Sequence, residues 1–174
     1  MTPEFSRPVR IDTLAQKPRE LSIGASEEER AALARRFGLV GIDHLSAELG
    51  IARRGDEVQA RGTLSARVTQ SCVASNAPVE AEVEESFDII FRPQPATASA
   101  EDEIELSGTE MDVVFYDGSS VDIGEAVAET LSLSLDPYPR APDAEAALRE
   151  AGVKSEEEAG PFGALAALRE KLKP

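Results

Sequence analysis

Apolar side chains recur at every second position over three stretches of the chain, residues 41–54, 57–71 and 79–92. A period of two is the spacing of a β-strand that buries one face. Gly55-Asp56 is a suitable two-residue turn between the first two stretches. The pattern therefore predicts an antiparallel three-stranded meander.

The register of this meander follows from the same alternation. A two-residue turn at Gly55-Asp56 pairs Ile51 with Ala60 and Leu49 with Gly62, which keeps the apolar positions on one face. For the second turn, apolar faces coincide when Val68 pairs with Ala81. This register also predicts two cross-strand ion pairs, Arg67 with Glu82 and Arg61 with Asp88.

Shorter elements flank the meander. Residues 5–14 and 111–117 alternate like strands, and residues 26–37 and 122–134 have helical spacing. Ser26 and Glu29 form a capping box at the start of the first helix, which Gly38 ends. Asp122 caps the second helix.

Together these elements predict an α+β fold: a mainly antiparallel sheet with two or three packing helices. The pattern leaves open whether the sheet closes into a barrel. Residues 1–150 form the expected domain, with a mobile acidic loop at 93–110 that is rich in Pro, Ala and carboxylates.

Residues 151–174 are expected to be a flexible acidic tail that ends in a short amphipathic helix. Phe162, Leu165 and Leu168 recur there at near-helical spacing. This helix either docks on its own domain or binds in a groove of a partner protein.

The charge balance bears on the partner. The 174 residues hold 18 Lys+Arg and 33 Asp+Glu, a net charge of −15. Such a chain is repelled by nucleic acid, whose binders gain affinity by neutralising phosphates. We therefore expect a basic protein partner and no DNA contact, and we favour an indirect over a direct contact with RNA. A high charge that serves only solubility remains the alternative.

A direct RNA-binding protein is the second hypothesis. It needs a local basic patch, for which the candidates are Arg7, Arg10, Arg53, Arg54 and Arg92. The predicted partners of Arg61 and Arg67 argue against a phosphate-binding sheet face.

Motifs for catalysis and cofactor binding are absent from the sequence. One histidine, His44, and one cysteine, Cys72, do not make a His/Cys metal cluster. Neither a Gly-rich phosphate loop nor a G-x-S-x-G nucleophile turn occurs. We expect no enzymatic activity and no cofactor, although carboxylates alone could serve acid–base catalysis.

The cellular location is also suggested by the sequence. The first residues lack the basic and apolar blocks of a signal peptide. No apolar run is long enough to span a membrane. Both observations, with the single cysteine, predict a cytoplasmic protein without membrane contact.

Two patterns resemble the YceD family of large-ribosomal-RNA-subunit accumulation proteins. The first is the turn at residues 70–76, where family members often carry C-x-x-C and this chain keeps only Cys72. The second is residues 121–140, an acidic residue, a short helix, a Glu followed by alternating leucines, and a proline-rich exit.

This resemblance implies a non-enzymatic role in the accumulation of 23S ribosomal RNA and in ribosome assembly. The partner would be a basic ribosomal protein or an assembly factor. We identify as candidate partner-contact residues Asp122, Glu125, Glu129, Tyr138, Arg140, Phe162, Leu165 and Leu168.

Overall fold

The computed structural model describes residues 3–94 and 112–153. The chain divides into two compact units, Met1–Gln70 with Glu80–Asp136, and Ser71–Val79 with Pro137–Pro174. The expected loop at 93–110 and the expected tail from residue 151 fall almost entirely outside the described residues.

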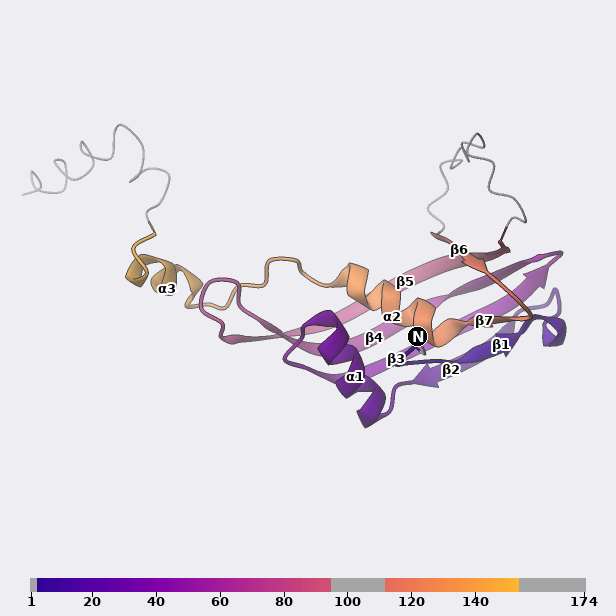
Figure 1. Cartoon of the computed structure of the whole chain (residues 1–174), viewed down its shortest axis with the longest axis horizontal. Helices are drawn as coiled ribbons and strands as arrows, with labels where there is room; N and C mark the ends of the chain where they lie inside the picture. The colour runs from indigo at the N-terminus through magenta and orange to yellow at the C-terminus, as the bar shows by residue number, and fades with distance from the viewer. Residues whose placement is uncertain (1–2, 95–111, 154–174) are drawn as a thin grey trace, which may run out of the picture. The chain divides into compact units, whose positions relative to one another are not determined.

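The larger unit contains a five-stranded sheet in the order β2-β3-β4-β5-β6 (Figure 1). Its strands are β2 (Arg19–Gly24), β3 (Gly41–Arg54), β4 (Glu57–Ser71), β5 (Pro78–Pro93) and β6 (Asp112–Tyr116). The β2–β3 and β3–β4 pairs are antiparallel, whereas β6 runs parallel to β5. The sheet is open, because β2 and β6 are edge strands.

The predicted register of the meander is confirmed between β3 and β4, where Ile51 pairs with Ala60 and Leu49 with Gly62. Both predicted ion pairs between β4 and β5 are also present. Their nitrogen–oxygen distances are 3.1 Å for Arg67–Glu82 and 3.9 Å for Arg61–Asp88. The alternation of apolar and polar residues therefore predicted the positions of these charged side chains as well as those of the core residues.

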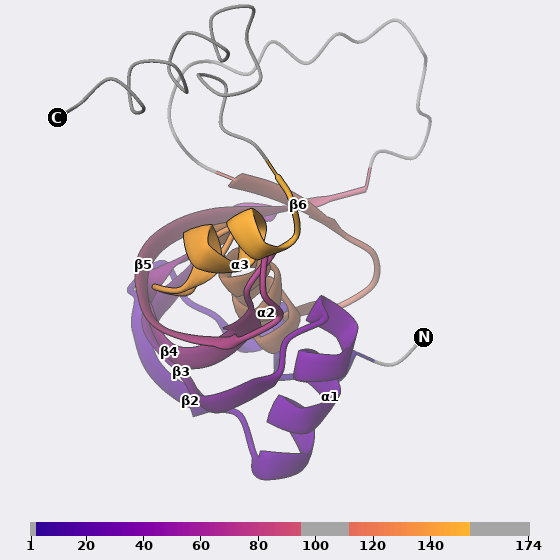
Figure 2. The ribbon, with the colours of Figure 1, turned by 90° about the vertical axis from the view of Figure 1, so that its left-hand side faces the viewer.

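Two helices cover one face of this sheet, α1 (Glu27–Phe37) and α2 (Ile123–Ser134). The predicted capping box of α1 is formed by Ser26 and Glu29, and Asp122 caps α2. Figure 2 shows β2, β3, β4 and β5 curving around α2. The helices therefore lie on the concave face of the sheet.

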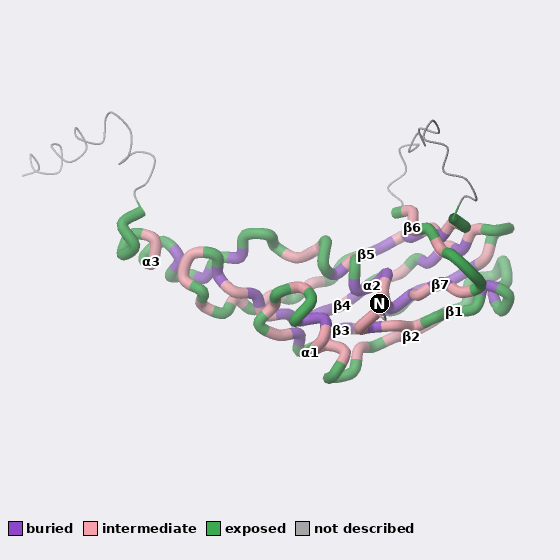
Figure 3. The backbone as a smooth tube through the Cα atoms, viewed as in Figure 1, coloured by how far each residue is buried: buried purple, intermediate pink, exposed green. Residues whose placement is uncertain are grey.

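The core lies between α1, α2 and the concave face. The α2 side chains Ile123, Val127 and Leu131 are all at most 1% exposed. On β3 and β4, buried positions alternate with less buried ones, which Figure 3 shows as alternating colours along the strands. One face of the meander is thus apolar and covered, and the other is polar.

The N-terminal strand differs from the expectation for residues 5–14. Only β1 (Pro8–Arg10) is a strand, and it pairs with β7 (Ser120–Asp122) in a separate two-stranded sheet. A 3₁₀ turn follows at Ile11–Thr13. Strand β2 was not predicted, because its only alternating apolar residues are Leu21 and Ile23.

The smaller unit contains a turn after β4 and a third helix, α3 (Ala144–Glu150), which was not predicted individually. Its buried cluster is Cys72, Ala141 and Ala144. The backbone amide of Val73 donates to the carbonyl of Pro139 over 3.0 Å. Small side chains allow the turn and the Pro-rich segment to approach each other closely.

Gly62 provides the first test of this fold. An added Cβ would lie 2.6 Å from Leu49 Cβ and closer still to the Glu48 carbonyl oxygen. We expect Gly62→Ala to lower the free energy of unfolding by about 3 kcal/mol, as over-packing does. Urea denaturation measures this change.

Gly41→Ala is the matched control, because an added Cβ at Gly41 meets no atom within 4 Å. Its unfolding midpoint should stay the same or rise slightly. Equal midpoints for the two variants would contradict the close approach of β3 and β4.

Candidate partner-contact surface

The face of the sheet that points away from α1 and α2 is here called the outer face. It is formed by polar side chains of the long strands. On β4 these are Gln59, Arg61, Thr63, Ser65 and Arg67. On β5 they include Glu82, Glu84 and Asp88. Within the described ranges, neither helix of the larger unit covers this face.

The arginines of β4 and β5 on the outer face have carboxylate partners. Arg92 on β5 donates to Glu57 on β4 over 2.8 Å, and Arg67 donates to Glu82. The Arg61–Asp88 pair is longer, and Gln59 also donates to Asp88, over 2.7 Å. These pairs place a carboxylate beside each guanidinium group and reduce its attraction for phosphate.

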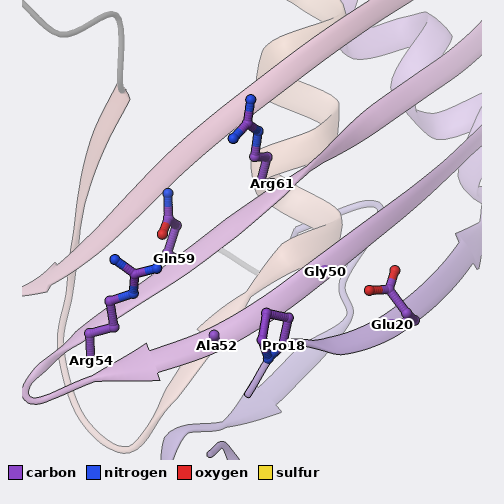
Figure 4. Close-up of a pocket in the computed structure, with 7 residues that line it drawn as sticks. All are labelled: Pro18, Glu20, Gly50, Ala52, Arg54, Gln59 and Arg61. Atoms are coloured by element: carbon purple, nitrogen blue, oxygen red, sulfur yellow. The ribbon is translucent and has the colours of Figure 1, made fainter. Parts of the chain in front are cut away.

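One hollow of about 470 Å³ lies at the β3–β4 turn end of the outer face. Gly50 and Ala52 form its floor, and Arg54, Gln59 and Arg61 stand beside them (Figure 4). The lining residues are Pro18, Glu20, Gly50, Ala52, Arg54, Gln59 and Arg61. With Glu20 on its rim and Asp88 beside Gln59, this hollow has mixed charge and no excess of cations.

A second hollow of about 550 Å³ lies toward the other end of the outer face. Its charged lining residues are Asp43, Arg67, Glu82 and Glu84. Arg67 is paired with Glu82. Asp43 and Glu84 have no cationic partner among the residues that the structure describes, so this hollow carries excess negative charge. It is here called the acidic hollow.

Two predicted contact residues take part in internal contacts. The Asp122 carboxylate accepts from the Ser6 hydroxyl over 2.5 Å, from the Arg7 amide over 2.7 Å and from the Glu125 amide over 3.2 Å. Glu125 accepts two hydrogen bonds from Arg36. Both side chains therefore hold α2 in place, and neither is free to recruit a partner without loss of these bonds.

The other predicted contact residues differ in their surroundings. Glu129 is exposed on α2, and Tyr138 and Arg140 are exposed in the smaller unit. Leu133 is 83% exposed on α2 and was not predicted. The tail candidates Phe162, Leu165 and Leu168 lie outside the described residues.

A network of ion pairs ties the N-terminal segment to both helices. Arg7 donates to both carboxylate oxygens of Glu29, over 2.7 and 2.8 Å. Its guanidinium lowers the pKa of Glu29 from 4.5 to about 2. Arg36 on α1 contacts Glu4 over 3.0 Å and Glu125 over 2.7 Å. These bonds couple segments that are far apart in sequence.

The single cysteine and the single histidine have local roles. Cys72 Sγ accepts from the amides of Ala141 and Ala74 over 3.3 and 3.4 Å. Hydrogen bonding from Ala141, followed by that from the Ser75 side chain, lowers the pKa of the Cys72 thiol to about 7. His44 Nε2 lies 2.9 Å from the Ser46 hydroxyl. Residues 3–94 and 112–153 contain no set of three His, Cys, Asp or Glu residues that could hold a metal ion.

The comparisons with known proteins agree with the resemblance in the sequence. A family model described as "Large ribosomal RNA subunit accumulation protein YceD" matches residues 60–169, more than half of the chain. This α+β protein with an open, partly uncovered sheet therefore belongs to the YceD family. No curated protein and no solved structure matches it.

The matched range contains β5, β6, α2 and α3 whole and most of β4, but neither α1 nor β3. None of the described helices is long and apolar enough to cross a membrane. The expected cytoplasmic location stays a prediction.

The acidic hollow was not predicted from the sequence, although the residue pattern contained part of the information. Asp43 follows the buried Ile42 at a β-bulge, and the alternation along β5 already placed Glu82 and Glu84 outward. What the alternation did not show is that β3 brings Asp43 beside them.

The Arg7–Glu29 pair gives a pH-dependent test. Glu29→Gln should lower the free energy of unfolding near pH 7 by about 1 kcal/mol, since the pair is partly exposed. Because the folded pKa of Glu29 is depressed, the wild-type advantage is complete above about pH 4.5 and is lost as the pH falls toward about 2. Urea unfolding across this range measures the difference.

Glu28→Gln is the control, since Glu28 is exposed on the same helical turn and makes no ion pair within the described chain. Its effect should vary little with pH. A constant difference for Glu29→Gln down to pH 2 would contradict the role of the ion pair.

Proposed function

We propose that this protein supports the accumulation of large-subunit (23S) ribosomal RNA and ribosome assembly through contacts with proteins, without catalysis. The observation that carries the proposal is membership of the YceD family. The net charge of −15 favours a basic partner, such as a ribosomal protein or an assembly factor.

The arrangement of the arginines favours a protein partner over bare RNA. Four of the five residues proposed for a basic patch have carboxylates close by: Arg7 with Glu29, Arg10 with Asp12, Arg53 with Asp56, and Arg92 with Glu57. Arg54 alone of the five makes no ion pair within the described chain. A binder of single-stranded RNA would also present aromatic side chains for base stacking, and β4 has none.

The shape of the surface supports a non-enzymatic role. Both hollows lie on the outer face of the sheet and are partly open to solvent, whereas small-molecule sites bury most of their ligand. His44 lines the second hollow, and its Nε2 lies 2.9 Å from the Ser46 hydroxyl. Within the described chain no third side chain bonds to the His44 ring to orient it, as catalysis by a Ser–His pair requires. Asp43 and Glu84 line an exposed sheet face instead of an enclosed cleft.

Affinity purification of the full chain tests the proposal. Mass spectrometry of the recovered proteins should show basic large-subunit ribosomal proteins or assembly factors above a control purification with an unrelated protein of equal charge. Recovery of none of these would count against the proposal. Depletion of the protein should also lower the ratio of 23S to 16S ribosomal RNA.

Arg67→Ala tests the RNA-binding alternative. Because Arg67 is paired with Glu82 and both are exposed, its removal should cost about 1 kcal/mol of stability or less. A gel-shift assay with a 23S RNA fragment should show no change. Arg54→Ala serves as the comparison, because Arg54 has no such partner. A large loss of RNA affinity in either variant would favour direct RNA binding.

A further inference from the structure

The first half of β5 has a strand edge that no described strand occupies. Strand β5 spans Pro78–Pro93, but β6 pairs only with Ile89–Pro93. In Figure 1, β6 lies beside one end of β5 only. Residues 80–88 therefore have β4 on one side, and no strand of the described chain on the other.

The backbone groups along this edge are available to a partner. In a strand, about half of the backbone amide and carbonyl groups point to each neighbour. Within residues 3–94 and 112–153, no turn or loop backbone bond and no side-chain bond reaches the backbone of residues 80–88. An edge of this kind is a template for an added strand.

The side chains beside the edge indicate which residues an added strand would carry. Glu80, Glu82 and Glu84 are exposed on the outer face, at the strand spacing of about 6.6 Å between alternate residues. Ala81 and Val83 lie on the opposite face, half-buried against the core. An added strand continues this alternation, so it meets carboxylates on one face and apolar side chains on the other.

We propose that the free edge of β5, residues 80–88, binds an extended segment of a basic protein in which Lys or Arg alternates with apolar residues. The segment adds to the sheet by backbone hydrogen bonds, in line with β6. The acidic hollow beside Asp43 and Glu84 receives one of its cationic side chains. This inference rests on the proposed function and names the class of partner and its contact site.

Charge excludes two other occupants of the edge. A second copy of this chain would place the carboxylates of two β5 edges opposite one another, and like charges across strands are destabilising. Nucleic acid lacks the backbone that pairs with a strand, and its phosphates are repelled by Glu80 and Glu84. The same carboxylates protect the edge from aggregation while it is empty.

The test uses the full chain and a dye-labelled, capped peptide in which Lys alternates with Val and Thr. Fluorescence anisotropy measures the affinity of the peptide for the chain. The salt concentration is about 0.1 M, at which the Debye length is about 10 Å. Hydrogen exchange at the amides of residues 80–88 should slow when the peptide is bound. Binding without protection of these amides overturns the proposal, as does the absence of binding.

Two matched variants separate the edge from the general charge of the chain. Glu84→Lys should lower the affinity for the peptide at least about fivefold, because an attractive cross-strand pair becomes repulsive. Glu48→Lys makes the same change of charge on the outer face of β3, away from the edge, and should change the affinity by less than about twofold. Equal weakening in both variants overturns the proposal.

A peptide with alternate backbone amides N-methylated separates strand addition from electrostatic attraction. It keeps every charge but loses the donors that pair with the edge, so its affinity should fall about tenfold. Unchanged affinity overturns the proposal. If the purification still recovers ribosomal proteins with Glu84→Lys as well as with wild type, this inference fails while the proposed function stands.

Discussion

The Asp122 carboxylate joins the two ends of the larger unit and so determines where α2 lies. One of its oxygens accepts from the Arg7 and Glu125 amides, and the other accepts from the Ser6 hydroxyl. It therefore caps α2 and ties this helix to a segment more than 100 residues earlier in the chain. The N-terminal segment packs closely against the start of α2, because Phe5 is fully buried and its carbonyl lies close to Gly124.

The position of α2 explains why the two faces of the sheet differ. The helix fills the concave face with Ile123, Val127 and Leu131, and α1 adds Leu33. The long strands thereby bury one apolar face and need no cover on the other, which polar side chains and cross-strand ion pairs stabilise in water. Within the described residues, the outer face is therefore left without a covering helix.

The distribution of charge connects this architecture to the biological process. Most arginines of the described chain that lie near the outer face are matched by carboxylates, whereas Asp43, Glu48 and Glu84 are not matched by cations. A surface of this kind attracts basic proteins and disfavours bare phosphate backbones. Membership of the YceD family links the chain to large-subunit ribosomal RNA accumulation.

Local patterns in the sequence were sufficient for the elements and for the meander. The capping box at Ser26 and Glu29 depends only on residues three positions apart. The turn at Gly55-Asp56 set the pairing of β3 with β4, since a shift by one residue would have turned every apolar side chain outward. The ion pair of Arg67 with Glu82 followed from the same constraint. The candidates on α2 were harder to judge, because exposure and pairing depend on neighbouring segments.

Only the tertiary structure decided the contacts between segments that are distant in sequence. The pairing of β1 with β7, the parallel addition of β6 and the binding of Glu125 by Arg36 have no local signal. The free edge of β5 is of this kind too, because it exists only where β6 ends. Side-chain periodicity specifies which face of a strand is buried, but it carries no information on which strand lies at its edge.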